Sequence, residues 1–277
     1  MSLTAEADTT GAPEGRDHPL LSLRGLTKTF GAVQALRSVD LDIPAGQITA
    51  VVGDNGAGKS VMIKTIAGIW APTAGQIYWD GESVAIRTPK EADQLGIATV
   101  YQDLALCDNL DIVQNMFLGH ENLSHRLLDE TSMELIAKQT LADLSVTTVS
   151  SVRQPVGSLS GGQRQSVAVA RAVMRDARLV IMDEPTAALG VSQTAQVIEL
   201  LKALGARGIA VIVISHNLNE VFSIADRLAV LYLGRMVSSG PIAEYDLQRA
   251  VELITTGRLA DTQPRASDGG TSSDPKG

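Results

Sequence analysis

The sequence GDNGAGKS, residues 53–60, decides the fold of this 277-residue chain. It matches the pattern G-x-x-x-x-G-K-[ST] and lies between the apolar run ITAVV and a predicted helix that begins at Lys59. That strand–loop–helix context is the one in which the pattern binds phosphate. Its glycines let backbone N–H groups close around the anion, and the start of the helix adds positive partial charge. The stretch therefore predicts a nucleotide-binding α/β fold.

Each position of this loop has an expected role. Lys59 is expected to neutralise the β- and γ-phosphates, and the Ser60 hydroxyl to bind Mg²⁺. The other positions are expected to offer backbone N–H groups to the phosphates: Gly53, Asp54, Asn55, Gly56, Ala57 and Gly58. ATP and Mg²⁺ are therefore the predicted cofactors.

Three further apolar strands end in polar side chains. LVIMDEP places Asp183 and Glu184 at one strand end, IAVIVISH places His216 at another, and ATVYQ places Gln102 at a third. Ligands bind at the carboxyl ends of the strands in open α/β sheets. Asp183 would then hold Mg²⁺, directly or through water, and Glu184 would be the general base. His216 is either a satisfied polar residue or a sensor of the γ-phosphate, and Gln102 either has no role or contacts Mg²⁺ and the water.

The sequence LSGGQ, residues 159–163, begins a second helix far downstream of the phosphate loop. Ser160, Gly161 and Gly162 are predicted to form an exposed turn that binds an anion at the start of this helix, which runs on from Gln163. This turn follows a long helical stretch, so we expect that it does not reach its own phosphate loop. A second copy or a related subunit would receive it, and two nucleotides would lie at one head-to-tail interface.

The composition excludes several classes of protein. The net charge is −8 at pH 7 and no long basic block is present, which argues against a nucleic-acid partner. Cys107 is the only cysteine, so no internal disulfide is expected, as is usual in a reducing cytosol. The apolar runs fall short of the ~18–20 residues of a membrane span, and the N-terminus has no apolar signal-peptide core. We expect a soluble chain that can dock on a membrane protein.

The order of the predicted elements gives one body with two tails. Residues 1–18 and 258–277 are rich in small, polar and acidic residues and are predicted to be disordered. The body, residues 19–257, alternates strands and helices, which predicts a parallel sheet, and a helical lobe is inserted at about residues 103–158. One helix of the lobe, with Asp129 as its N-cap, is predicted to bury one face: Met133, Ile136, Ala137, Leu141 and Leu144.

Three more local patterns are clear. QIYWDGESV predicts a hairpin with Asp80 and Gly81 at its turn, and RLAVLYLGRMVSSG predicts another. The helix after LVIMDEP, closed by Gly205 and Gly208, is predicted to bury one side: Val197, Leu200, Leu201 and Leu204.

The ordered set GDNGAGKS, VYQDL, LSGGQ, LVIMDEP and SHN resembles the ATP-binding cassette of ABC transporters over roughly residues 20–257. The resemblance implies a P-loop NTPase cassette with a RecA-like parallel-sheet core, an antiparallel β subdomain and an inserted α-helical lobe. It also implies roles at matching positions. Phe30 would stack on adenine, Gln102 would be the hinge of the lobe, Glu184 the base and His216 the switch. The partner's ATP would be contacted by the LSGGQ residues: Ser160, Gly161, Gly162 and Gln163.

Longer stretches resemble one branch of that family. RTPKEADQLGIATVYQDLALCDNLDIVQNMFLG and PTAALGV are similar to ATPases of bacterial monosaccharide importers, the fructose, ribose and xylose types, and most of all the fructose type with one cassette. The resemblance implies a peripheral subunit on the cytoplasmic side of the membrane that energises sugar import. Its partners would be a polytopic permease, a second cassette and, indirectly, a periplasmic or extracellular sugar-binding protein. Gly190 stands where aspartate is usual after DEPTAAL, which leaves the coupling between the two sites open.

The stretch DLALCDNLDIVQNMF holds more large apolar residues than a small lobe needs for its own core. Four of them, Leu104, Leu106, Leu110 and Phe117, either pack the lobe or face a short cytoplasmic helix of the permease inserted between lobe and sheet. Two other functions stay open: a soluble ABC-type ATPase that acts on DNA or ribosomes, and an importer of a different small solute. The residues alone do not distinguish import from export.

Overall fold

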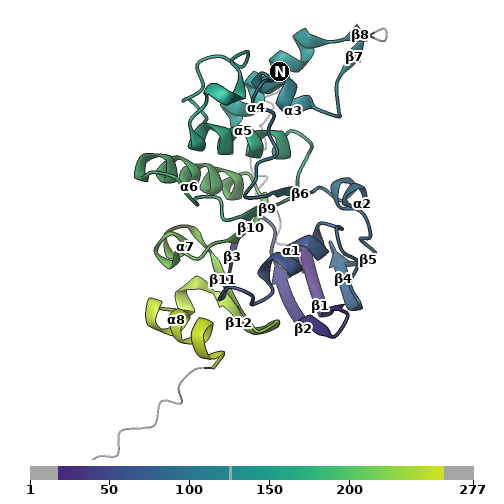
Figure 1. Cartoon of the computed structure of the whole chain (residues 1–277), viewed down its shortest axis with the longest axis vertical. Helices are drawn as coiled ribbons and strands as arrows, with labels where there is room; N and C mark the ends of the chain where they lie inside the picture. Colours follow the sequence, from purple (N-terminus) through teal and green to yellow (C-terminus); the bar gives the residue numbers. More distant parts are fainter. Residues whose placement is uncertain (1–17, 125–126, 259–277) are drawn as a thin grey trace, which may run out of the picture.

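The computed structural model describes residues 18–124 and 127–258 (Figure 1). Apart from His18 and Arg258, the two predicted tails lie outside the described residues. Among the described residues, no helix has both the length and the apolar character needed to cross a bilayer.

The N-terminal part forms an antiparallel sheet in the order β2-β1-β4-β5. Its strands are β1 (Leu21–Phe30), β2 (Val33–Ile43), β4 (Ala74–Trp79) and β5 (Glu82–Val84). The predicted turn at Asp80 and Gly81 is confirmed. Both residues have left-handed backbone angles, with φ of 54° and 84°, as a two-residue hairpin turn with right-handed strand twist requires.

The second sheet is the core of the molecule and has the order β12-β11-β3-β10-β9-β6. Its neighbours are parallel except for the edge strand β12, which pairs antiparallel to β11 in the predicted hairpin. The strands are β3 (Ile48–Val52), β6 (Ile97–Val100), β9 (Leu179–Asp183), β10 (Ala210–Ile214), β11 (Arg227–Tyr232) and β12 (Arg235–Pro241).

Helices cover both faces of the core sheet, so its central strands are buried on both sides. In β9, Leu179 and Ile181 join the cluster that contains the antiparallel sheet and α1, whereas Val180 and Met182 join the cluster with α5 and α6. Burial of alternate residues on two faces explains why these strands read as continuous apolar runs. The helices on the sheet are α1 (Lys59–Ile66), α2 (Pro89–Gln94), α5 (Gly161–Val173), α6 (Val191–Ala206), α7 (Leu218–Ile224) and α8 (Leu247–Thr256).

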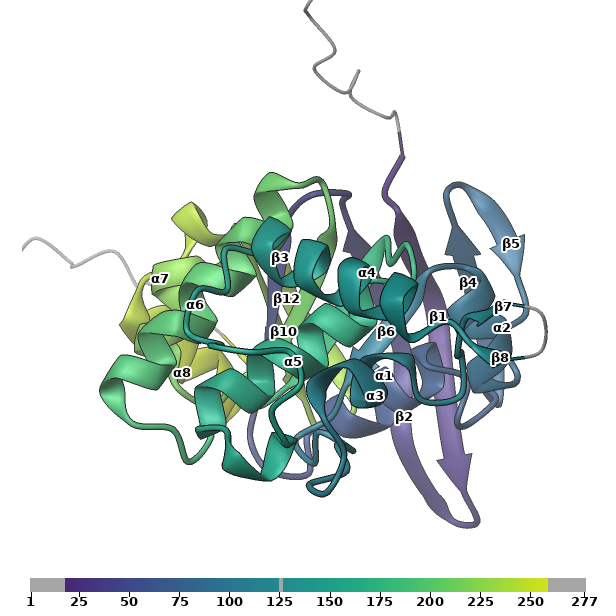
Figure 2. The same cartoon turned by 90° about the horizontal axis from the view of Figure 1, so that it is seen from above.

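The lobe lies at one end of the molecule, over the α5 and α6 side of the sheet (Figures 1 and 2). It contains α3 (Ile112–Phe117) and α4 (Glu130–Asp143), both packed on α5. The lobe also contains a small hairpin that was not predicted, β7 (Leu123–Ser124) and β8 (Leu127–Leu128), whose strands are too short to show periodicity. Two short 3₁₀ turns complete the described fold, η1 (Val156–Ser158) and η2 (Ile242–Glu244).

The predicted N-cap of α4 is confirmed, because the Asp129 carboxylate accepts the N–H of Ser132 at 3.0 Å. The predicted face is correct except at Ile136, which is 36% exposed because it lies at the edge of the stripe. The buried members of the face follow i, i+4 and i+3 spacing: Met133, Ala137, Leu141 and Leu144.

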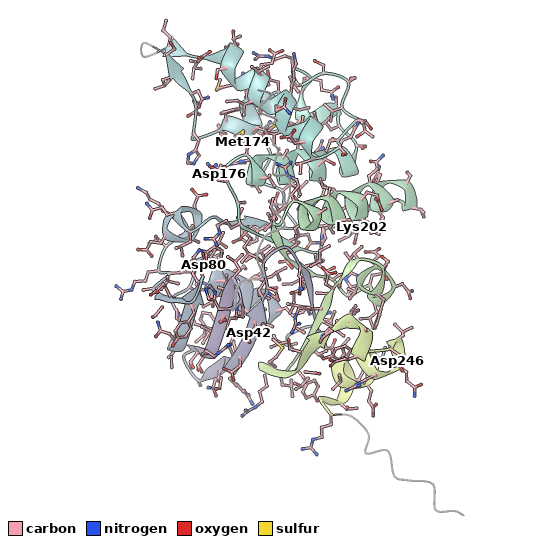
Figure 3. All side chains as sticks on the ribbon, turned by 180° about the vertical axis from the view of Figure 1, so that it is seen from behind. Asp42, Asp80, Met174, Asp176, Lys202 and Asp246 are labelled. Carbon is pink, nitrogen blue, oxygen red and sulfur yellow. The ribbon has the colours of Figure 1, made fainter. Side chains whose placement is uncertain are left out.

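The buried side of α6 is also as predicted: Val197, Leu200, Leu201 and Leu204. The helix continues through Gly205 to Ala206, and Gly208 follows with a left-handed φ of 79°. Figure 3 marks Lys202 on the exposed side of α6 and Asp80 on the antiparallel sheet, where Asp80 accepts a hydrogen bond from Arg178 at 2.6 Å. This ion pair connects the turn of the antiparallel sheet to the start of β9.

Candidate active site

A cavity of about 800 Å³ opens at the carboxyl end of the core sheet. It is lined by the phosphate loop and by the ends of β9 and β10, together with Gln102, which follows β6. Parallel pairing of β3, β10, β9 and β6 places these strand ends at one edge of the sheet. The predicted residues that line the cavity are Gly53, Asp54, Asn55, Gly56, Gly58, Lys59, Ser60, Gln102, Asp183, Glu184 and His216.

Close approach of the backbone explains two glycines of the loop. A Cβ atom at Gly53 would lie 2.2 Å from the Leu231 carbonyl oxygen, and one at Gly58 would lie 2.8 Å from the Ala35 carbonyl oxygen. Both glycines also have positive φ, 156° and 106°. Ala57 differs from its neighbours: it is buried beneath the loop, and its N–H donates to the Asp54 carbonyl at 3.1 Å.

The Lys59 ammonium lies inside the curve of the loop. Its Nζ donates to the carbonyl oxygens of Gly53 at 2.7 Å and Asp54 at 3.0 Å. Partial burial lowers the pKa of Lys59, and the charges of Glu184, Asp54 and Asp183 oppose that shift. The positive charge is therefore held where an anionic ligand of the loop would contact it.

Two carboxylates follow β9 in different surroundings. Burial raises the pKa of Asp183, and the neighbouring charge of Glu184 raises it further. Glu184 has a left-handed φ of 52°, an uncommon conformation for a residue with a side chain. Its N–H donates to the Ile214 carbonyl at 2.9 Å, and its own carbonyl accepts the N–H of Ala187 at 3.1 Å. This turn fixes the Glu184 backbone at the end of the sheet.

His216 and Glu184 are joined directly, with 2.7 Å between Nδ1 and Oε2. The carboxylate can only accept, so Nδ1 carries the proton. In a neutral ring Nε2 is then an acceptor, and it can donate to a phosphate oxygen only when the ring is protonated. The His216 side chain is 75% exposed and that of Glu184 only 19%, so the histidine extends from the sheet edge into the open part of the cavity.

The oxygen donors of the cavity fit Mg²⁺. Ser60, Asp183 and Gln102 offer a hydroxyl, a carboxylate and an amide oxygen to the same space. Mg²⁺ takes oxygen ligands, and in nucleotide sites it keeps waters and phosphates besides one or two protein groups. Within residues 18–124 and 127–258, no group of three or more His, Cys, Asp or Glu is placed to hold a metal ion.

The LSGGQ turn differs in detail from the prediction, because α5 already begins at Gly161 and neither glycine has a left-handed conformation. Ser160 and Gln163 form a capping box: the Ser160 hydroxyl accepts the Gln163 N–H at 3.3 Å, and Oε1 of Gln163 accepts the Ser160 N–H at 2.9 Å. The glycines allow close packing on the start of α6. A Cβ at Gly161 would lie 2.7 Å from the Leu189 side chain.

Two groups of predicted residues lie outside this cavity. Neither Phe30 nor residues 160–163 are among the described residues that line it. The Phe30 ring is 40% exposed and meets Trp70 edge to face, with 4.9 Å between the ring centroids. Sequence reasoning did not identify Trp70, which follows α1 and has no periodic signal of its own.

The cavity also has an apolar wall that sequence reasoning missed. Leu218 of α7 lines it together with Val251 and Ile254 of α8. The i, i+3 spacing in α8 and its N-cap Asp246 (labelled in Figure 3) could have predicted a helix there. Its position beside the phosphate loop follows only from packing against β11.

Comparison with known proteins identifies the family of the chain. Residues 36–187 match the sequence profile of the family described as "ABC transporter". The chain belongs to this family. It is 46% identical to the fructose import ATP-binding protein of Rhizobium meliloti, over 86% of this chain and 94% of that one. It is 40% identical to the xylose/arabinose import ATP-binding protein of Sulfolobus acidocaldarius, again over 86% of this chain and 94% of the relative.

Solved ABC cassettes share the fold. One is the dimeric, post-hydrolysis structure of the ATP-binding cassette MJ0796 with ADP and phosphate. It superposes with a TM-score of 0.66 at 26% identity and covers 80% of this chain and 98% of that one. The expected P-loop cassette, with parallel core, antiparallel subdomain and helical lobe, is therefore confirmed.

Proposed function

We propose that this ABC cassette hydrolyses ATP to energise import of a simple sugar, of the fructose or pentose kind, through a membrane permease. The observation that carries the hydrolytic part is the cavity that joins Lys59, Asp183, Glu184 and His216. The sugar-import part is supported by the names of the relatives that match along nearly their whole length. The chain acts at the cytoplasmic face of the membrane, where ATP is present.

Each of the cavity residues has a separate role in ATP hydrolysis. The loop N–H groups and Lys59 bind the phosphates of ATP. Ser60, Asp183 and Gln102 would hold Mg²⁺, which would supply positive charge for the phosphate oxygens. Glu184 accepts the proton of the attacking water, whose oxygen bonds to the γ-phosphorus as the bond to ADP breaks. His216 orients the Glu184 carboxylate and, when protonated, donates from Nε2 to the γ-phosphate.

A complete site needs a second cassette. Residues 160–163 lie outside the cavity of their own chain, and a related cassette forms a dimer with ADP and phosphate bound. Two cassettes placed head to tail, either two copies of this chain or this chain with a related subunit, therefore each offer the LSGGQ turn to the other's ATP. The start of α5 suits this contact, because a helix N-terminus favours an anion.

Substitution of Ser160 by arginine tests the composite site. The bulky cation replaces the cap at the partner's phosphates, so we expect ATPase activity to fall on the order of 100-fold and ATP-dependent dimers to disappear. ATP binding to the single chain stays normal. Ser223→Arg, on the exposed side of α7, is the control for the added charge.

Mixed dimers sharpen this test. A Ser160→Arg chain paired with a Lys59→Ala chain contains one intact site, so the mixture should recover part of the activity that each variant lacks. Heterodimers that form without activity would mean that the two sites turn over only together. Unchanged ATPase activity in Ser160→Arg alone contradicts the composite site.

A second cavity, of about 600 Å³, lies between the lobe and the sheet. We propose this cavity as the docking groove for the permease. It is bounded by α2, β6 and α5, and Leu104 lines it. Of the four apolar residues considered for this contact, Phe117 is buried in the lobe core, Leu110 is half-buried, and Leu104 and Leu106 both pack against that core. Among these four, Leu104 alone lines the groove, so we propose it as the groove contact.

Leu104→Glu tests this docking groove. A charge buried against the permease without a partner is costly, so we expect stimulation of ATPase activity by the reconstituted permease and sugar-loaded binding protein to fall about tenfold or more. Nucleotide affinity should not change. Leu127→Glu, at a leucine that is 73% exposed outside the groove, is the matched control. Retention of full stimulation in Leu104→Glu, or binding of the wild-type chain to DNA or ribosomes at physiological salt, contradicts the proposal.

A further inference from the structure

Glu220, in the first turn of α7, connects the two loops that carry Glu184 and His216. Its Oε2 accepts a hydrogen bond from the Thr186 hydroxyl at 2.5 Å, and its Oε1 accepts one from the Asn217 amide at 2.8 Å. Thr186 lies two residues after Glu184, and Asn217 lies directly after His216. All three side chains of this link are partly buried.

The backbone reinforces the link on the His216 side. Asn217 caps α7 through its Oδ1, which accepts the Glu220 N–H at 3.5 Å, and its own N–H donates to the Ser215 hydroxyl at 3.0 Å. Ser215 is buried at the end of β10. The carbonyl oxygen of Asn217 also accepts the Val221 N–H of α7 at 3.1 Å. The loop that carries His216 is therefore tied to α7 by the side chain and the carbonyl oxygen of Asn217.

The Glu184 side has fewer constraints. The left-handed turn at Glu184 is closed by its hydrogen bonds to Ile214 and Ala187. Among the described residues, Thr186 makes the only side-chain hydrogen bond between this turn and α7. The exposed His216 ring depends on its 2.7 Å contact with Glu184 for its orientation. A change in the separation of the two loops would break that contact.

We propose that Glu220 is a positioning residue that sets the separation of the Glu184 and His216 loops for hydrolysis. The inference rests on the proposed roles of Glu184 and His216 in the ATPase reaction. Both carboxylate oxygens of Glu220 are engaged, and the residue is not among those that line the cavity, so it is not a second base. Its role is geometric.

Glu220 could instead act only by stabilising α7, and the two roles predict different effects of its substitution. An acidic residue in the first turn of a helix also stabilises that helix through its dipole. A residue with only that function would affect thermal stability and leave the kinetics of the folded enzyme unchanged. If Glu220 positions the two loops, its loss should lower kcat and leave KM nearly unchanged. The reason is that the phosphate loop that binds ATP makes no contact with Glu220.

The experiment compares Glu220→Ala, Glu220→Gln, Thr186→Val and the double variant Glu220→Ala/Thr186→Val in the full chain. ATPase kcat and KM, affinity for a fluorescent ATP analogue and melting temperature are measured for each. Glu199→Ala, an exposed carboxylate of α6 paired with Lys202, is the control. Glu184→Gln is run in parallel to test the proposed function separately.

For Glu220→Ala we expect kcat to fall about 10- to 100-fold, with KM and analogue affinity within about twofold, since small displacements of catalytic groups are costly. Glu220→Gln, which keeps one acceptor and adds a donor, should recover most of the activity. The double variant should be no worse than Glu220→Ala, because both remove the same link. Wild-type kcat in folded Glu220→Ala, a parallel loss of ATP affinity, or additive losses in the double variant overturns the inference. Full activity in Glu184→Gln would instead overturn the proposed function.

Discussion

Glu184→Gln should lower kcat by on the order of 10²–10⁴ while ATP still binds. Glutamine keeps the size of the side chain, and its carbonyl oxygen can still accept the hydrogen bond from Nδ1 of His216, which Glu184 now accepts at 2.7 Å. The amide cannot take up the proton of the attacking water. The loss therefore falls on the chemical step and leaves the phosphate loop intact.

Phosphate release under saturating ATP and size-exclusion chromatography together check this expectation. A cassette that binds ATP and cannot hydrolyse it should accumulate as an ATP-dependent dimer, and we expect the wild type to form that dimer only transiently. Glu199→Gln, an exposed carboxylate of α6, controls for the loss of charge. Near-normal ATPase activity in Glu184→Gln would remove Glu184 from the role of base.

Lys59→Ala should weaken the affinity of the chain for ATP on the order of a hundredfold. The Lys59 ammonium is half-buried inside the phosphate loop and contacts the carbonyl oxygens of Gly53 and Asp54. Its removal takes away the one cation that the cavity lining holds among the described residues, apart from a protonated His216.

Titration with a fluorescent ATP analogue measures this loss. Lys64→Ala is the matched control, because Lys64 lies on the same helix, packs over the Trp70 ring at 5.1 Å and does not line the cavity. Affinity should fall in Lys59→Ala and stay near the wild-type value in Lys64→Ala. Equal affinity in the two variants would mean that the loop is not the phosphate cradle.

Local patterns in the sequence predicted the parts of the structure that depend on neighbouring residues. The phosphate loop needs glycine where φ is positive, at Gly53, Gly56 and Gly58, and the turn at Asp80 and Gly81 needs left-handed backbone angles. The Asp129 cap and the buried side of α6 follow from hydrogen bonding and periodicity within one helix. Each of these signals is complete within about 10 residues, so the sequence determines them without the rest of the fold.

Contacts between distant segments could be decided only by the tertiary structure. Thr186 meets Glu220 although α6 and β10 separate them in the sequence, and α8 forms a wall of the cavity because it packs on β11. Phe30 lies against Trp70, and Phe117 belongs to the lobe core and not to its surface. No local pattern in the sequence predicts that these segments touch, because the distance between them depends on the packing and strand order of the whole sheet. The sequence thus predicted most of the polar residues that line the cavity, and the fold decided which distant side chains contact the loops that carry them.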